Sequence, residues 1–213
     1  MRVERDGPWL DVHFEQPQHV LSWAIVGGGL GTGQRIAWRK VSDGDVAGDV
    51  VAWTQRQAAE RGIDGPVMLT AASLDRLSRA ECSVGGITAR ALVTVGLNNR
   101  LAVGDPPGPG PVGTINLLVH VDVPLSVAAL LEALSIAVQA RTAAVIDAGL
   151  PSVVSGKQAT GTGTDCVVLV CPMQGDEQVY SGMHTALGSA IGQAVRSACD
   201  TGVREWVDVV YSR

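Results

Sequence analysis

The sequence predicts an α/β fold of the mixed α+β kind, with one domain over residues 1–213 in which helices cover a mixed β-sheet. Three observations support this expectation. The chain has 213 residues, close to the usual size of one domain. Hydrophobic residues make up 46% of the chain and charged residues only 17%, which indicates a large apolar core. Segments with strand period and segments with helical period follow one another without a strict strand–helix repeat.

The first forty residues are predicted to be mainly strands. Apolar and polar residues alternate over 10–15, which is typical of a half-buried strand. The apolar run 20–26 and the alternating run 35–39 flank the glycine-rich segment 27–33. We therefore expect a hairpin with a wide loop at these glycines.

The rest of the chain is predicted to carry three helices and several buried strands. The expected helices cover 49–61, 127–148 and 185–199. The expected strands cover 66–71, 87–97, 114–123 and 164–171. Gly62, Gly149 and Gly202 are expected to end the helices, and Ser126 to cap the second one. The Pro- and Gly-rich segment 104–111 is interpreted as a surface loop inside the domain, not as a linker.

Charge and hydropathy exclude several classes of protein. The net charge is −5 and the only lysines are Lys40 and Lys157, which argues against a nucleic-acid partner. The first residues lack the apolar core of a signal peptide, so we expect a cytoplasmic protein. The apolar stretch 125–150 contains Glu132, Gln139, Arg141 and Asp147 and is interpreted as a core helix, so no membrane partner is expected.

The cysteines and histidines do not form a metal-binding pattern. Cys82, Cys166, Cys171 and Cys199 include no C-x-x-C pair and are interpreted as buried free thiols. The four histidines, which lack i,i+4 pairing, are His13, His19, His120 and His184. We therefore expect no metal site.

Three short clusters place polar groups beside glycine at the edge of apolar elements. They are Gly113–Asn116, Gly161–Asp165 and Tyr180–His184. Glycine there lets a substrate approach the backbone. Amide hydrolysis needs a base, an acid and donors for the oxyanion, and His184, Asp165 and Asn116 are the candidate catalytic groups. Helix capping and Asx-turns would explain Thr164, Asp165 and Thr185 without catalysis.

The glycine-rich segment 27–33 does not match a dinucleotide-binding fingerprint. The G-x-G-x-x-G spacing fails in every frame, and a strand rather than a helix follows. Two interpretations remain: a plain hairpin loop, or a loop whose backbone N–H groups meet a large ligand or an anion.

Several segments together resemble the adenosylcobinamide amidohydrolases over nearly the whole chain. They are Leu21–Ser22, Gly28–Gly29, Met68–Ala72, Val95–Asn99, Gly113–Asn116, Ala140–Ala144, Gly161–Asp165 and Tyr180–Gly188. The resemblance implies a corrinoid-salvage enzyme that hydrolyses the amide joining the aminopropanol arm to the ring, releasing adenosylcobyric acid. It implies a corrinoid substrate and no cofactor, because the cobalt would belong to the substrate.

The substrate-binding residues expected from these clusters and from the resemblance are Ser22, Gly28, Gly29, Asn98, Asn99, Thr114, Gly161, Thr162, Gly163, Thr164 and Tyr180. The attacking group is left open between Ser22, Thr114, Thr164 and an activated water.

Two positions depart from the family pattern. Arg100 stands where the family has alanine, and Gln139 stands where it has glutamate. Because glutamine cannot ionise, the alternative is a divergent, non-catalytic corrinoid-binding protein. A further alternative is an assembly protein, in which the Ala- and Gly-rich face of the last helix packs against a second copy in a homo-oligomer.

Overall fold

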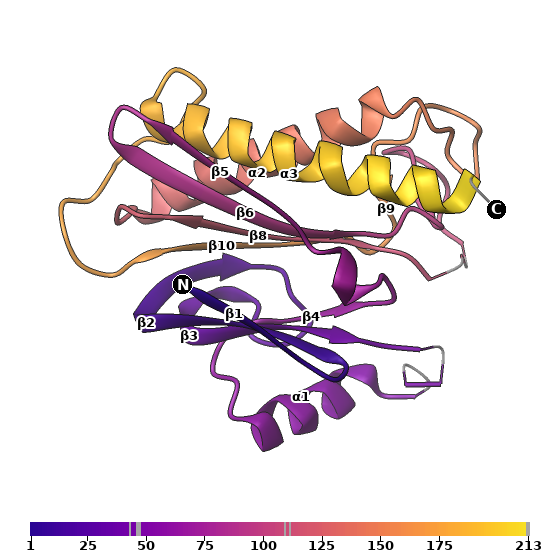
Figure 1. Ribbon diagram of the computed structural model, residues 1–213, viewed down its shortest axis with the longest axis horizontal. Helices are drawn as coiled ribbons and strands as arrows, with labels where there is room; N and C mark the ends of the chain where they lie inside the picture. The colour runs from indigo at the N-terminus through magenta and orange to yellow at the C-terminus, as the bar shows by residue number, and fades with distance from the viewer. Residues whose placement is uncertain (43, 46–47, 109, 111, 212–213) are drawn as a thin grey trace.

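An eight-stranded mixed sheet bends into two facing layers, and helices cover both outer faces (Figure 1). This computed structural model describes every residue except 43, 46–47, 109, 111 and 212–213. The architecture therefore has four layers, in the order helix, sheet, sheet, helices (Figure 1). The predicted mixed α+β fold with helices on a mixed sheet is confirmed.

The lower layer of Figure 1 comes from the N-terminal part of the chain. Its elements are β1 (Arg2–Asp6), β2 (Trp9–Ser22), β3 (Gly29–Lys40) and β4 (Val67–Thr70), with α1 (Val50–Arg61) on the outside. Buried Asp11 of β2 holds α1 in place by accepting from Arg61 Nη2 at 2.7 Å.

The upper layer comes from the rest of the chain. Its strands are β5 (Ser78–Val84), β6 (Ile87–Val95), β8 (Ile115–Val121) and β10 (Cys166–Pro172), and its helices are α2 (Val127–Asp147) and α3 (Ala186–Tyr211). A short 3-10 helix, η1 (Leu74–Arg76), leads into β5, and β7 (Arg100–Leu101) pairs with β9 (Gly161–Thr162) in a separate ribbon.

Strand directions decide which ends meet. The strands β8 and β10 are parallel, so both begin at the same edge of the sheet. The antiparallel neighbours β6 and β2 end at that edge. β2 also joins the layers, because it pairs with both β3 and β10.

The alternation of side chains along β8 separates two cores. Leu117 and Val119 belong to the core beneath the helices, whereas Leu118 belongs to the core between the two layers. By the same period, Asn116 and His120 point between the layers, at opposite ends of the strand.

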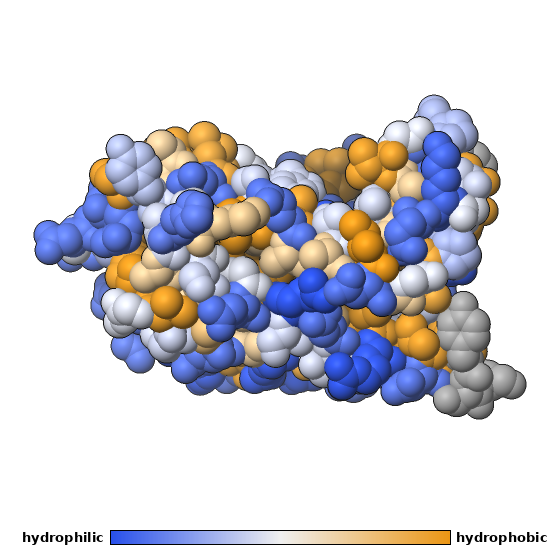
Figure 2. All heavy atoms as spheres, turned by 90° about the horizontal axis from the view of Figure 1, so that it is seen from above, coloured by the Kyte–Doolittle hydropathy of each residue, from blue (hydrophilic) through white to orange (hydrophobic). Residues whose placement is uncertain are grey.

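Helix α2 is a core helix of this domain. It is long and apolar enough to span a membrane by length and composition alone, but its inner residues are buried against the sheet and α3. On the helical side of the molecule, apolar and polar side chains are interspersed (Figure 2). Packing inside the domain therefore accounts for the apolar residues on the inner face of this helix.

Most predicted helix boundaries are confirmed. Asp49 caps α1, Gly62 follows it in the left-handed conformation, Ser126 caps α2 and Gly149 follows α2 with φ +67°. The strands at 66–71, 87–97, 114–123 and 164–171 appear as β4, β6, β8 and β10 with slightly shorter bounds. The described part of 104–111 forms neither helix nor strand, and residues 109 and 111 lie outside it.

Three local predictions were wrong or incomplete. α3 continues through Gly202, where a Cβ would lie 2.7 Å from Val95 Cγ2, so this glycine permits close helix–sheet packing rather than ending the helix. β5 was not predicted. The glycines 29–33 belong to β3, not to a loop. A Cβ at Gly33 would lie 2.8 Å from Gly65 Cα, so glycine is needed there for close backbone packing.

The Ala-rich face of α3 is used within the chain. Ala190, Ala194 and Ala198 are buried in the core between α3 and the sheet. This face is therefore covered by the protein's own strands, and the assembly hypothesis loses the surface that motivated it.

Candidate functional site

Seven of the eight segments that carry the family resemblance meet at one end of the molecule, where β8 and β10 begin. The exception is Tyr180–Gly188. At this end, shown on the right in Figure 1, polar side chains gather around the first residues of β8 and β10. We call this group the Asp165–Asn116 cluster; its members are Ser22, Thr114, Asn116, Arg141, Thr162, Thr164 and Asp165.

Asp165 is the structural centre of the cluster. Its Oδ1 accepts from Ile115 N at 3.0 Å and from Thr162 Oγ1 at 2.5 Å. Its Oδ2 accepts from Thr162 N at 3.0 Å and from Arg141 Nη1 at 2.5 Å. Four donors thus occupy the carboxylate, which suits a positioning role better than that of a free base.

Arg141 and Gly161 complete this arrangement. Arg141 reaches from α2 to the start of β10 and also donates to Thr160 O at 3.2 Å. A Cβ at Gly161 would lie 2.2 Å from Arg141 Nη1, so glycine is required for the ion pair to form. The sequence reasoning did not select Arg141, although a lone cation among the buried residues Ala137, Arg141 and Ala144 of an apolar helix is a usable signal.

Asn116 connects the two layers of the sandwich. The residue is 1% exposed, and its Nδ2 donates to Leu69 O of β4 at 2.7 Å. Thr114 Oγ1 lies 3.1 Å from Asn116 Oδ1 and 2.8 Å from Thr164 O. Thr164 Oγ1 in turn donates to Gly113 O at 2.8 Å. The hydroxyl protons of both threonines are therefore directed at acceptors of the protein itself.

Ser22 presents a different hydroxyl. Its Oγ accepts from Ala24 N at 2.9 Å and lies 4.0 Å from Cys166 Sγ. Burial raises the pKa of the Cys166 thiol to about 12, against the opposing hydrogen bond from Ser22, so the thiol stays neutral at neutral pH. Among the described residues, no carbonyl or carboxylate accepts from the Ser22 hydroxyl. Ser22 is thus the cluster hydroxyl with the least committed proton.

Trp23 forms an exposed aromatic surface beside the cluster. The residue is 46% exposed, and its Nε1 donates to Asp165 O at 2.6 Å. This hydrogen bond fixes the ring without burying it. Sequence reasoning missed Trp23, because nothing in the local pattern shows that the residue after a strand will hold this position.

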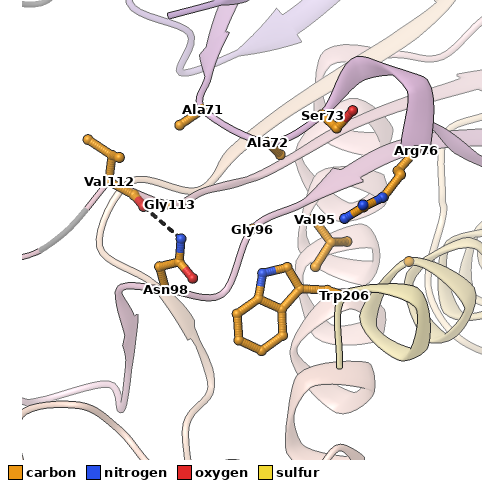
Figure 3. A pocket seen from close by; sticks show the side chains of 11 residues that line it. Ala71, Ala72, Ser73, Arg76, Val95, Gly96, Asn98, Val112, Gly113 and Trp206 are labelled. Carbon is orange, nitrogen blue, oxygen red and sulfur yellow. Dashed lines mark hydrogen bonds between the residues drawn. The ribbon is translucent and has the colours of Figure 1, made fainter. Parts of the chain in front are cut away.

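Asn99 and Asn98 lie beside Gly113, the residue before Thr114 of the cluster. Asn99 is 8% exposed, lies against Gly113 and Gly163, and its Oδ1 has no hydrogen-bond partner among the described residues. Exposed Asn98 donates from Nδ2 to Val112 O at 3.5 Å (Figure 3). Asn98 lines a cavity of about 170 Å³ that Gly113 also borders.

The glycines expected to bind substrate differ in whether there is room for a side chain beside them. A Cβ at Gly28 would lie 2.4 Å from Ala24 O, so this glycine serves a tight turn. Gly29 has φ +96° and open space around it. Gly163 lies beside Asn99 and Leu101 at ordinary contact distance.

The structure does not bring His184 and Tyr180 to the cluster. Both side chains are exposed, and α3 starts close to Gly85, where a Cβ would lie 2.9 Å from Ala186 Cβ. Gly85 belongs to the β5–β6 turn, at the end of the sheet where β8 finishes. With a rise of about 3.3 Å per residue, the two ends of β8 are roughly 20 Å apart. The expectation that His184, Asp165 and Asn116 share one site was therefore wrong.

The segment around His184 is held on α2 by hydrogen bonds and caps the start of α3. Ser181 N donates to Glu132 Oε2 at 2.6 Å, and Ser181 Oγ donates to Ala129 O at 2.8 Å, which docks the segment on α2. Thr185 Oγ1 accepts from Gly188 N at 2.9 Å, as an N-cap does. The capping interpretation weighed for Thr185 is confirmed.

Neither departure from the family pattern removes a group from the cluster. Gln139 is exposed on α2 and donates to Ser135 Oγ at 3.0 Å. Arg100 Nε donates to Pro151 O at 2.8 Å, so its side chain ties β7 to the loop after α2. The non-catalytic alternative rested on these two positions and therefore loses its physical motive.

The cysteines are free thiols, and most of them are buried. Cys166, Cys171 and Cys199 are buried free thiols and Cys82 is half-buried. Within the described ranges, no three His, Cys, Asp or Glu side chains gather into a group suited to a metal ion.

A family model and a curated relative both match this chain and name the same activity. The family model of adenosylcobinamide amidohydrolase matches residues 1–210. An adenosylcobinamide amidohydrolase of Halobacterium salinarum is 32% identical over 144 residues, which are 63% of this chain and 57% of that protein. The match thus spans somewhat more than half the length of this curated relative.

Two solved structures resemble the fold. The PH0078 protein of Pyrococcus horikoshii OT3 has a TM-score of 0.50 at 13% identity, over 91% of this chain and 76% of that one. An L-aminopeptidase D-Ala-esterase/amidase of Ochrobactrum anthropi has a TM-score of 0.41 at 15% identity, over the same shares. At 13% identity, the first of these likenesses concerns the fold alone.

Proposed function

The chain belongs to the adenosylcobinamide amidohydrolase family, and on that premise we propose that it hydrolyses the amide between the aminopropanol arm and the corrin ring of adenosylcobinamide. The oxygen of water adds to the amide carbonyl, the C–N bond breaks, and a proton passes to the leaving nitrogen. The products are adenosylcobyric acid and aminopropanol, as in cobalamin salvage.

The observation that carries this proposal is the convergence of Ser22, Thr114 and Asn116 at an edge where both layers meet. Amide hydrolysis needs donors that stabilise the developing oxyanion and a group that binds the attacking oxygen. Asn116 Nδ2 uses one hydrogen for Leu69 O and has a second for the amide carbonyl. Ser22 has the hydroxyl of the cluster whose proton is least committed, and we assign it the contact with the attacking oxygen or the attack itself.

Asp165 and Arg141 act as positioning residues in this scheme. Their ion pair fixes the first residues of β8 and β10, because Asp165 also accepts from Ile115 N. The exposed ring of Trp23 offers an apolar surface for the flat corrin. The cobalt belongs to the substrate, no resident cofactor is needed, and the reaction is assigned to the cytoplasm.

The direct test is incubation of the purified chain with adenosylcobinamide, followed by mass spectrometry of both products. Ser22→Ala and Asn116→Ala are each expected to lower kcat by about a hundredfold or more, the scale seen when an oxyanion donor is removed. Ser181→Ala is the matched control: a buried serine at the opposite end of the molecule, whose loss should leave kcat unchanged.

Two outcomes would redirect the assignment. Tight binding of cobinamide without any product would favour the non-catalytic corrinoid-binding alternative. Hydrolysis that survives in both Ser22→Ala and Asn116→Ala would move the reacting groups away from this cluster.

A further inference from the structure

We propose that the small cavity beside the Asp165–Asn116 cluster holds the aminopropanol arm of the substrate, an inference that rests on the proposed function. The cavity lies between the segment after β4, the end of β6, the segment before β8 and the last turns of α3 (Figure 3). It therefore lies at the edge of the sheet where β6 ends, and α3, which covers the outer face of the upper layer, forms one of its walls.

The cavity and the cluster share one stretch of backbone. Gly113 borders the cavity, and Thr114 and Asn116 follow it in the cluster. Gly96 N, on the opposite wall, donates to Thr114 O at 2.9 Å. Ala71 comes two residues after Leu69, whose carbonyl accepts from Asn116. Asn116 and the cavity thus share neighbouring backbone, and we place the amide at Asn116 with its nitrogen substituent directed toward the cavity.

The volume of the cavity fits a small substituent on the amide nitrogen and not a large one. The cavity measures about 170 Å³. An apolar cavity of about 150 Å³ accepts a molecule of the size of benzene. A three-carbon amino alcohol is smaller than benzene and fits, whereas the corrin ring does not. The ring must therefore stay outside, where Trp23 is exposed.

Two glycines that border the cavity, Gly113 and Gly202, permit close packing of the elements around it. A Cβ at Gly113 would lie 2.8 Å from Asn99 Oδ1 and 3.0 Å from Gly96 O. A Cβ at Gly202 would meet Val95, which borders the same cavity. Glycine at both positions therefore lets these elements pack closely around the cavity, where a side chain would push them apart.

The lining matches the chemistry of the arm. Val95, Ala72 and the ring of Trp206 provide apolar contacts for the methyl group, and the indole nitrogen faces the cavity (Figure 3). Asn98 lies at the rim, and its 3.5 Å contact to Val112 O is too long to commit its amide, which leaves a donor for the arm's hydroxyl.

Arg76 gives the cavity a preference for the uncleaved arm. Its guanidinium is turned toward the space beside Val95 (Figure 3). The amide-linked arm is neutral, but the released amine is protonated at neutral pH. Repulsion between the two cations therefore favours departure of the product.

The test changes the cavity and the arm together. Ala71→Leu fills the cavity from a half-buried position and is expected to lower kcat/KM for adenosylcobinamide by about tenfold or more. For an analogue with an N-methyl amide in place of the arm, the loss should stay below about threefold. Ala143→Leu, at a half-buried alanine of α2 away from the cavity, is the matched control and should change neither value.

A second variant addresses the hydroxyl contact. Asn98→Ala changes an exposed residue and is expected to raise KM for the aminopropanol arm but not for a propyl arm without the hydroxyl. If the wild type hydrolyses adenosylcobinamide and Ala71→Leu affects both amides equally or not at all, the arm site is refuted while the proposed function stands. A wild type without hydrolysis refutes the proposed function, and the arm site with it.

Discussion

Arg141 of α2 and Asp165, the residue before β10, form an ion pair of 2.5 Å in which both side chains are at most 10% exposed. The pair links the helical layer to the edge of the sheet where the candidate site lies. Because Asp165 also accepts from the backbone of Ile115 and Thr162, the pair orders the start of β8 and the turn before β10 together. Its contribution is therefore both to stability and to the geometry of the site.

Removal of the cation should be costly. Arg141→Gln leaves the Asp165 carboxylate buried without its counter-charge, and breaking such a pair typically costs about 3–5 kcal/mol. We expect a fall of that order in the free energy of unfolding measured in urea, together with a loss of hydrolysis. Arg141→Lys keeps the charge and should recover part of both. A glutamine variant as stable and as active as the wild type would contradict the role given to this pair.

His184 provides the opposite prediction. The residue is exposed at the far end of the molecule from Asn116, so His184→Ala should keep kcat/KM within about threefold of the wild type, which is less than 1 kcal/mol. The measurement is a progress curve with adenosylcobinamide at neutral pH. A loss of a hundredfold or more would place the reaction near the start of α3 and would overturn the site described above.

The local hydrophobic pattern of the sequence predicted the helices and strands in which buried residues recur with a regular period. The apolar run of α2, its cap at Ser126 and the stop at Gly149 can all be read from the sequence because neighbouring residues determine them. Gly202 could not be read in the same way. Its role depends on Val95, which is distant in sequence and close only after α3 packs on β6.

The candidate site was only partly predictable for the same reason. The motifs at the starts of β8 and β10 predicted Asn116 and Asp165 as candidate groups, and the structure brings the two residues together because these strands are parallel and begin at one edge. The motif containing His184 carries equally suggestive residue types, but the chain enters α3 from the other end of the sheet. The end of the sheet from which the chain enters α3 depends on the topology, and residue type and spacing do not reveal it.

His120 is the titratable group with the clearest effect on stability. It is 9% exposed between the two layers, and its ring lies 5.2 Å from that of Phe14. Burial lowers the pKa of His120 to about 4, with smaller contributions in the same direction from Arg90 and the N-terminal amine, while Asp122 opposes them. The folded protein therefore holds this imidazole neutral at pH values where an exposed one is protonated.

This difference predicts a loss of stability in mild acid. Below the ordinary histidine pKa of about 6.5, the unfolded chain takes up a proton that the folded protein refuses, so the free energy of unfolding falls as the pH falls toward about 4. Between pH 7 and pH 5 the loss due to His120 should be about 2 kcal/mol. His120→Gln removes this contribution, so the difference in pH dependence between the two proteins isolates the effect of His120. Urea denaturation of both proteins at the two pH values gives the difference directly, and equal pH dependence would show that His120 is protonated in the folded state.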